Sequence, residues 1–465
     1  MTQLSRQGLQ EIWRLALPII ASMASATVAG FVDTWFIAQI GTAEVAAGMP
    51  AGISAYTLTA FPLGITQCVS TFAAQALGRR EPREGAAYAW QGLYLSMVVG
   101  LASFLFWPTA PAFFALFGHE PEIVGLEVLY FRIRLWGVGL SVGVGALNGF
   151  FYGMHRPRVP LFAMVVDNIA NVVLCYLLVF GKFGAPALGL AGAAWAFVLS
   201  FVAQLAVLLA VFLSSPCHAE FATRAAWRLS WKRLRQLLHI GWPAGAQSAI
   251  DVLGWGVFIV LLVGRFGKEH LAASNIAIQY MTISFMPGIG LAQALTALVG
   301  RYIGEGRSEL AIQRVYEGLF LALSYMTCMG VMYLTLRGPF IAFFNTDPMV
   351  IEIGKKILLC VAVFQLFDAM NFTFAGALRG AGDTHWTAGL IVVLSLLLFA
   401  PLSLGAVAFT DLQSLGPWIA GTIYSIVLGL ALWRRFACGK WREIDIFANR
   451  EAEQEVIVPS REAAG

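Results

Sequence analysis

Residues 15–40 read LALPIIASMASATVAGFVDTWFIAQI, a run in which Asp33 is the single charged side chain. A helix of this length, rising about 1.5 Å per residue, crosses the roughly 30 Å hydrocarbon core of a bilayer. No cleavage pattern follows the run, so we interpret it as a membrane helix and not as a signal peptide. Eleven further apolar runs follow, and all twelve are predicted to be helices because backbone polar groups in lipid need internal partners. The predicted spans are 13–39, 45–76, 86–110, 123–153, 159–181, 189–213, 236–264, 272–300, 312–336, 350–378, 385–408 and 414–434.

The composition excludes several classes of protein. Of 465 residues, 59% are hydrophobic and 12% are charged, whereas an average soluble domain carries about 25% charged residues. The net charge of +4 is not gathered on a soluble face, so we expect membrane lipid and no nucleic acid as a partner. The six cysteines form no C-x-x-C pair, and the chain has no phosphate-binding loop and no metal-ligand cluster. We therefore expect no catalytic residues, no metal site and no cofactor.

The Lys and Arg residues between the spans indicate the orientation in the membrane. With the N-terminus inside, the inside connections carry most of them, including Arg79, Arg80 and Arg83. The outside loops 41–44 and 117–122 carry none. By the positive-inside rule we expect a multi-pass protein of a bacterial inner membrane with both termini in the cytoplasm.

An internal repeat is visible in three matched segments. LALP at 15–18 matches IGWP at 240–243, GITQ at 64–67 matches GLAQ at 290–293, and GFFYG at 149–153 matches GALRG at 376–380. The offsets are 225, 226 and 227 residues. Because six spans is an even number, both halves enter the membrane from the same side, which makes the repeat parallel.

The repeat and the polar stretches predict the domain boundaries. We expect an N-terminal lobe at 1–213, a cytoplasmic linker at 214–235, a C-terminal lobe at 236–436 and a cytoplasmic tail at 437–465. Trp227, Trp231 and their basic neighbours in the linker indicate either a helix at the membrane interface or a solvated loop near the headgroups.

Acidic residues inside the spans are the first candidates for a functional site. An acid in the hydrocarbon region costs at least about 2.5–3.5 kcal/mol, so its presence needs a reason. Asp251 and Asp368 are mid-span, and Asn371 follows Asp368 by one turn. Asp33 lies nearer an interface, where plain solvation is the alternative. We interpret Asp33, Asp251, Asp368 and Asn371 as cation-coupling residues; the alternative for the mid-span acids is a hydrogen bond that holds helices together.

A second polar group lies on the predicted helix 159–181. Asp167 and Asn171 are four residues apart on one stripe, which continues to Cys175, and Asn168 is adjacent. The group is interpreted either as the polar lining of an N-lobe cavity or as a contact between helices. With no nucleotide site in the sequence, transport would draw its energy from an ion gradient.

These residues resemble the multidrug and toxic compound extrusion (MATE) family. The resemblance covers 15–435 and is carried by ALP at 16–18 with Asp33, DNIAN at 167–171, GWP at 241–243 with Asp251, and Asp368 followed by GALRGAGDT at 376–384. It implies two six-helix lobes in a V and an antiport of organic cations or drug-like molecules against Na⁺ or H⁺. A monomer is expected because the repeat supplies both halves of the cleft.

The resemblance also carries residue roles. Asp251 and Asp368 are similar to the cation site of the NorM-type branch, although the first acid is usually Glu there. Asp33 and Asn171 match the N-lobe site of another branch, in which Cys175 is an acid. Tyr280, Met281 and Phe285 are expected to line the substrate path, with ordinary packing as the alternative.

Three other functions compete with this interpretation. A lipid-linked precursor flippase of the same superfamily would have a basic central cavity. We expect Lys and Arg to be absent from the spans, so that no such basic cavity could form. A membrane enzyme acting on lipids would place acids, His or a metal motif together at one interface. A channel fits mid-span acids in a duplicated chain less well than alternating access does.

Overall fold

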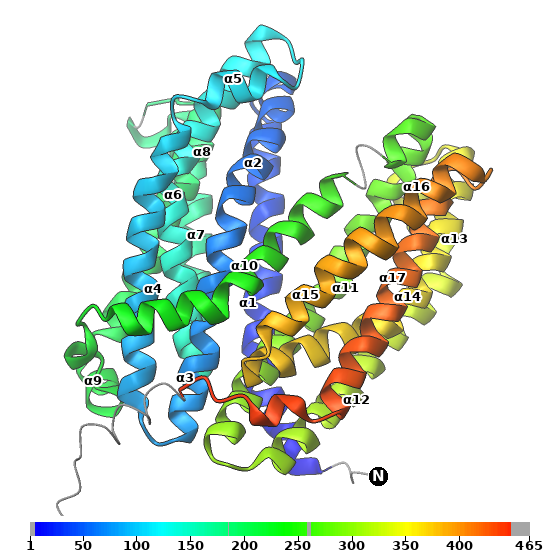
Figure 1. The fold of residues 1–465 in the computed structure, drawn as a ribbon. Coiled ribbons are helices and arrows are strands. Elements are labelled where there is room, and N and C mark those ends of the chain that lie inside the picture. The colour runs from blue at the N-terminus through cyan, green and yellow to red at the C-terminus, as the bar shows by residue number, and fades with distance from the viewer. Residues whose placement is uncertain (1–4, 185, 258–261, 448–465) are drawn as a thin grey trace, which may run out of the picture.

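The computed structural model describes residues 5–184, 186–257 and 262–447, and within these ranges all regular secondary structure is helical. The helices form two bundles that lie side by side (Figure 1). The N-terminal bundle consists of α1 (Arg6–Ala38), α2 (Thr42–Gln67), α3 (Val69–Gly78), α4 (Pro82–Ser103), α5 (Ala110–Ala115), α6 (Pro121–Gly153), α7 (Arg158–Phe180) and α8 (Leu190–Phe212). The C-terminal bundle consists of α10 (Trp231–Val257), α11 (Lys268–Gly304), α12 (Ser308–Thr335), α13 (Arg337–Phe344), α14 (Pro348–Ala381), α15 (Thr384–Leu394), α16 (Ala400–Phe409) and α17 (Leu415–Ala437).

The all-α membrane fold predicted from the sequence is confirmed. Nine helices among the described residues are long and apolar enough to cross a membrane. The other three predicted spans coincide with α2–α3, with α6 and with α10. The predicted span at 236–264 runs through residues 258–261, which lie outside the described residues.

Local sequence sets where the helices begin and end. The Ser5 hydroxyl accepts from the amide of Gly8 at the start of α1, and Asp347 caps α14 by accepting from the amide of Met349 at 2.8 Å. Pro82, Pro121 and Pro348 occupy first-turn positions, where the missing N–H leaves no gap in the helix. The helices are therefore delimited by local chemistry as well as by the apolar runs.

The two bundles converge at one end of the molecule and diverge toward the other (Figure 1). We call the end at which α1 begins and α17 ends the terminal face, and the opposite end the open face. Helices α1 and α10 connect the bundles, because α1 packs on both α7 and α11, and α10 packs on both α2 and α15. This exchange follows the internal repeat, in which α1 corresponds to α10 and α2 to α11.

Repeat-equivalent glycines allow the bundles to approach closely. A Cβ added to Gly64 of α2 would lie 2.6 Å from the carbonyl oxygen of Ala244, and one added to Gly290 of α11 would lie 2.6 Å from Cγ1 of Ile20. Nearer the terminal face, Gly78 and Gly304 face each other: a Cβ on Gly78 would lie 2.8 Å from Cα of Gly304. Glycine at these crossings permits backbone contact between the bundles.

The linker and the described part of the tail both pack against the bundles. After α9 (Ser215–Phe221) and a short 3₁₀ turn (Thr223–Ala226), residues 227–230 are non-helical and α10 begins at Trp231. Trp227, Leu229 and Trp231 are exposed. In the predicted tail, Trp441 is fully buried and Phe447 nearly so, while residues 448–465 lie outside the described residues.

Candidate functional site

The predicted acid Asp368 lies buried on α14 among neutral partners. Its Oδ1 accepts from Nδ2 of Asn371 at 2.9 Å and from the hydroxyl of Ser425 on α17. Nδ2 of Asn371 also donates to the Ser425 hydroxyl at 2.9 Å, and the Asn371 Oδ1 is buried with no hydrogen-bond partner among the described residues. The group therefore presents oxygen atoms, at least one of them unpaired, and none of the basic residues in the described ranges lies within ion-pair distance of Asp368.

The second predicted acid of this bundle, Asp251 on α10, has different surroundings. The side chain of Asp251 is exposed to solvent, even though other parts of the protein lie around it. Arg379 is near enough to attract the Asp251 carboxylate electrostatically. Tyr424 lies within electrostatic range of both Asp251 and Asp368, and its hydroxyl accepts from Ser395 at 3.4 Å. Ser395 begins a short π-helical segment, Ser395–Phe399, a feature that often occurs at functional sites.

In the N-terminal bundle, Asp33 on α1 meets the polar stripe of α7. The Cys175 thiol lies within donor distance of Oδ1 of Asp33, at 3.6 Å, and of Oδ1 of Asn171, at 3.9 Å, so these three side chains form one group. Asp167 and Asn171 are both buried, and Asp167 is close enough to Asp33 for mutual repulsion. The structure thus brings together the residues that the sequence placed on two separate helices.

The remaining polar residues of α7 form contacts between helices. Asp167 lies near Ser200 on α8, whose hydroxyl donates to the Phe197 carbonyl at 2.9 Å, and Oδ1 of Asp167 is buried without a partner among the described residues. Asn168 donates to the hydroxyl of Ser25 on α1. Asn168 thus makes a contact between helices, while Asp167 keeps an unpaired oxygen; none of Asp167, Asn168 and Asn171 is among the described residues that line the cavity of the N-terminal bundle.

A cavity of about 410 Å³ lies beside this group, mainly within the N-terminal bundle. Its walls are largely apolar, and Arg134 on α6 is the one charged side chain among the described residues that line it. Our expectation that Lys and Arg avoid the spans is wrong for Arg134, which falls inside the predicted span 123–153. The lining residues are Ser22, Met23, Ala26, Ala55, Tyr56, Thr59, Leu63, Gln67, Arg134, Gly137, Val138, Ser141, Val144, Gly145, Asn148, Gly149, Tyr152, Met164, Phe197, Phe201, Gln204 and Gln293.

The three residues expected to line the substrate path do not line this cavity. The Tyr280 ring stacks on Phe340 with 4.9 Å between the ring centroids, and its hydroxyl donates to the Phe340 carbonyl. Met281 is buried in the C-terminal bundle, and Phe285 packs edge-on against Phe372. These contacts are those of packing residues.

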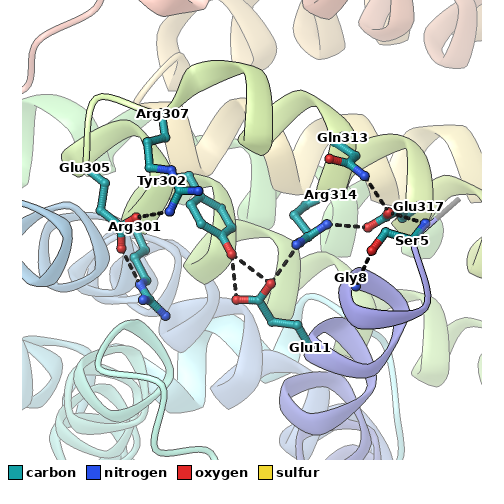
Figure 2. Close-up of polar contacts among 10 residues, drawn as sticks. All are labelled: Ser5, Gly8, Glu11, Arg301, Tyr302, Glu305, Arg307, Gln313, Arg314 and Glu317. Carbon is teal, nitrogen blue, oxygen red and sulfur yellow. Dashed lines mark hydrogen bonds and ion pairs between the residues drawn. The ribbon is translucent and has the colours of Figure 1, made fainter. Parts of the chain in front are cut away.

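An ion-pair network that the sequence analysis did not find closes the terminal face (Figure 2). Glu11 of α1 accepts from Nε of Arg314 on α12 at 2.8 Å and from the hydroxyl of Tyr302 on α11 at 2.7 Å. Arg314 also pairs with Glu317 at 2.8 Å, and Glu317 accepts from the amide of Ser5 at 2.9 Å. We call Glu11, Tyr302, Arg314 and Glu317 the α1 latch.

A counterpart lies at the start of α10. Nε and Nη2 of Arg233 each donate to one carboxylate oxygen of Glu84 on α4 at 3.0 Å, and Tyr88 donates to Oε1 of Gln236 at 2.6 Å. Tyr88 and Arg314 are equivalent at the repeat offset of 226. We call Glu84, Tyr88, Arg233 and Gln236 the α10 latch.

Other bonds between the bundles also lie on the terminal side of the molecule. Gln75 of α3 donates to the carbonyl of Gly380 at 3.0 Å, and Thr71 donates to that of Arg379 at 2.9 Å. Within the described ranges, the hydrogen bonds that join the bundles are all on this side. The molecule is therefore closed at the terminal face and parted at the open face.

Two bundles of membrane-spanning helices, closed at one end and holding the buried acids Asp167 and Asp368, for which the described part of the chain supplies no ion-pair partner, define a membrane transporter. The MatE family model matches residues 18–177 and 246–404, one segment in each half, and the chain belongs to this family of multidrug efflux transporters. The chain is 27% identical to the probable multidrug resistance protein NorM of Thermotoga maritima over 96% of both chains. It is 29% identical to the probable NorM of Xylella fastidiosa over 90% of both chains.

The fold agrees with a solved transporter structure. The outward-facing conformation of a multidrug resistance MATE family transporter of the MOP superfamily superposes with a TM-score of 0.84, covering 94% of this chain and 97% of that one at 20% identity. At this identity the likeness concerns the fold alone. The family resemblance and the all-α membrane fold expected from the sequence are both confirmed.

Proposed function

We propose that the protein is a secondary active antiporter that exports organic cations or other drug-like molecules in exchange for Na⁺ or H⁺ by alternating access. The observation that carries the proposal is the buried carboxylate of Asp368, whose hydrogen-bond partners, Asn371 and Ser425, are both neutral. A carboxylate held in this way in a membrane protein is stabilised when it binds a proton or a hard cation. Oxygen ligands from Asp368 and Asn371 suit either ion.

Exchange requires an ion-binding group and a protein with two conformations; the acids supply the first, and the two latches stabilise one of the conformations. Binding of an ion at Asp368, Asp251 or Asp33 changes the charge in the interior, and the two latches hold one of two conformations. An ion shifts this equilibrium only by its differential affinity for the two states. Parallel halves within one chain supply both sides of the cleft, so we propose a monomer as the working unit.

The orientation belongs to the same proposal. The basic connections lie at the terminal face, which is assigned to the cytoplasm of a bacterial inner membrane. In that orientation the open face is external and the described conformation faces outward. A C-terminal green fluorescent protein fusion that fluoresces, together with an inactive alkaline phosphatase fusion at the same point, supports it; the opposite pair of results contradicts it.

The function is tested by efflux of a fluorescent organic cation from proteoliposomes under separate Na⁺ and pH gradients. Asp368→Asn is expected to abolish gradient-driven efflux because the amide cannot exchange an ion. Glu352→Gln is the matched control: it lies on the same helix, pairs with Lys355 at 2.7 Å and is exposed. Full gradient-driven efflux by Asp368→Asn would contradict the proposed role of this acid.

Arg134 in the cavity favours a second candidate, a lipid-linked precursor flippase. One arginine is much less than a basic cavity, so this function remains the alternative. Movement of a phosphorylated lipid probe across the bilayer, with no efflux of any organic cation, would replace the first proposal with the second.

A further inference from the structure

The cavity of the N-terminal bundle has a charge opposite to that expected for a site that binds organic cations. Its walls are apolar apart from a few amides, hydroxyls and the guanidinium of Arg134. The geometry points to a binding site for an amphipathic organic carboxylate, with Arg134 as its counter-ion. This inference rests on the proposed transport function and names the substrate class of one of its cavities.

The guanidinium of Arg134 keeps most of its hydrogen-bond donors unused. Its Cζ lies 3.3 Å from the ring centroid of Phe197, and Nη1 makes a long contact of 3.5 Å with the Tyr130 hydroxyl. Within the described residues, no carboxylate lies within 4 Å of its nitrogens. Because a guanidinium has five N–H donors in a planar fork, a ligand carboxylate can bind it through two parallel hydrogen bonds.

Asp33 does not neutralise Arg134 by direct contact. The two attract each other electrostatically, but among the described residues no ion pair joins them, and the Asp33 carboxylate accepts from the Cys175 thiol at 3.6 Å. A ligand carboxylate beside Arg134 would repel ionised Asp33, so the ligand binds more tightly when Asp33 is protonated. Ligand and proton then bind together at this cavity, which is the opposite of exchange. We therefore assign the exchange of ligand for an ion to the acids of the C-terminal bundle.

Two unpaired amide oxygens in the cavity wall indicate that the ligand also carries a hydrogen-bond donor. Oδ1 of Asn148 and Oε1 of Gln204 are buried without hydrogen-bond partners in the described part of the chain, and both residues line the cavity. An unpaired buried amide oxygen is unfavourable, and a donor on the ligand would remove that penalty. Between these groups the walls are formed by side chains such as Met23, Leu63 and Phe201. The preferred ligand thus has a carboxylate, an apolar or aromatic body and an N–H or O–H donor.

The experiment measures binding to the purified full-length protein in phosphatidylcholine nanodiscs. Dansylglycine is titrated by fluorescence against the neutral dansylglycinamide and the cationic dansylcadaverine, with protein-free nanodiscs as the blank. These probes share one fluorophore and differ in charge. A charge-assisted bond of about 1.5–3 kcal/mol predicts a preference of roughly 10-fold or more for the carboxylate over the amide.

Variants of α6 test whether Arg134 causes the preference for the carboxylate probe. Arg134→Gln is expected to remove it while leaving dansylglycinamide affinity within about 2-fold, and Arg134→Lys is expected to keep part of it. Arg132→Gln is the matched control, since Arg132 is a half-buried cation two residues away that does not line the cavity and donates to the Trp107 carbonyl at 3.2 Å. Its ligand preference should equal that of the wild type.

Several results would overturn the inference. They are equal binding of the carboxylate and the amide by the wild type, tighter binding of dansylcadaverine, or a preference that Arg134→Gln retains. Loss of dansylglycine binding in phosphatidylglycerol nanodiscs would assign Arg134 to a lipid headgroup and would also reject the inference.

If Arg134→Gln does not fold, the three probes on the wild type and the Arg134→Lys variant still test the carboxylate preference. Gradient-driven cation efflux without any carboxylate preference rejects this inference alone, whereas carboxylate binding without efflux rejects the proposed function alone.

Discussion

At the scale of single residues, Ser425 fixes the arrangement around Asp368. Its hydroxyl donates to the carboxylate and accepts from Asn371, so three side chains from α14 and α17 form one group. A Cβ on Gly429, one turn further along α17, would lie 3.2 Å from Oδ1 of Asn371. The small residue at that position keeps the amide in place.

Ser425→Ala is predicted to change the ion dependence of efflux, and the direction identifies the ion. If the ion is H⁺, losing a donor to the ionised carboxylate makes the proton bind more tightly, and half-maximal efflux needs about 10-fold less H⁺. If the ion is Na⁺, a ligand oxygen is lost and more Na⁺ is needed. Thr422→Ala, whose hydroxyl bonds only its own helix at the Trp418 carbonyl, is the control. An unchanged ion dependence in Ser425→Ala would show that the hydroxyl has no such role.

The sequence predicted the acids and the neighbouring Asn371, but not Ser425. Asp33, Asp167, Asp251 and Asp368 are visible because each is a charge within an apolar run. Arg134 gives the same signal, because it is a charge within the predicted span 123–153. Ser425 carries no such signal, because a hydroxyl in a membrane helix usually bonds its own backbone and only the fold shows that this one faces Asp368.

At the scale of helices, the α1 latch joins the start of one helix to the bundle across from it. Arg314 and Glu317 are buried, and Glu11 connects them to α1. We predict that Glu11→Gln weakens closure by about 1–3 kcal/mol, because the Arg314 guanidinium loses a charged partner. The population opened at the terminal face should therefore rise about 5- to 150-fold relative to the closed one.

This population can be measured by electron–electron double resonance between spin labels at positions 158 and 437. Arg158 and Ala437 are exposed at the terminal face, one in each bundle, and Cys328, Cys360 and Cys438 are first replaced by serine. Glu309→Gln removes an exposed ion pair with Arg442 and should leave the distances unchanged. Identical distance distributions for Glu11→Gln and Glu309→Gln would show that the latch does not hold the face closed.

Helix positions were predictable because apolar runs, prolines and caps act locally. The break at Cys68 between α2 and α3 and the π-helical turn at Ser395 were not predicted, since neither has a distinct local pattern. Both depend on how neighbouring helices pack. The latches were missed for a related reason, because Glu11 and Arg314 are 303 residues apart and each alone resembles an ordinary charge at a membrane interface.

At the scale of the whole molecule, closure depends on contact between Gly78 and Gly304. A Cβ on Gly78 would lie 2.1 Å from the Arg301 carbonyl oxygen, and one on Gly304 would lie 2.2 Å from that of Gln75. Gly78→Ala is predicted to force the bundles apart at the terminal face at a cost of about 1–3 kcal/mol, lengthening the distance between the labels at 158 and 437. Gly30→Ala, where a Cβ meets open space, is the control. Unchanged distances in Gly78→Ala would mean that the contact does not limit closure.

The repeat explains why these two glycines meet. Residues 78 and 304 are equivalent at the offset of 226, as are Gln75 and Arg301, whose carbonyls they approach. A position that contacts its own equivalent must lie near the pseudo-two-fold axis. The sequence alone gives the offset, but the contact requires the path of both bundles through space.

A residue on a two-fold axis has a further meaning in the history of a chain. In a symmetric dimer of identical six-helix polypeptides, the residue on the axis would contact its own copy. One substitution there would add a side chain from each subunit at the same point of the interface. The Gly78–Gly304 contact has the geometry of such a subunit interface, now held within one polypeptide. Because the linker joins the halves, their association does not depend on concentration. The two halves can also differ, and here Asp368 and Arg134 each lack an equivalent charged residue in the other half.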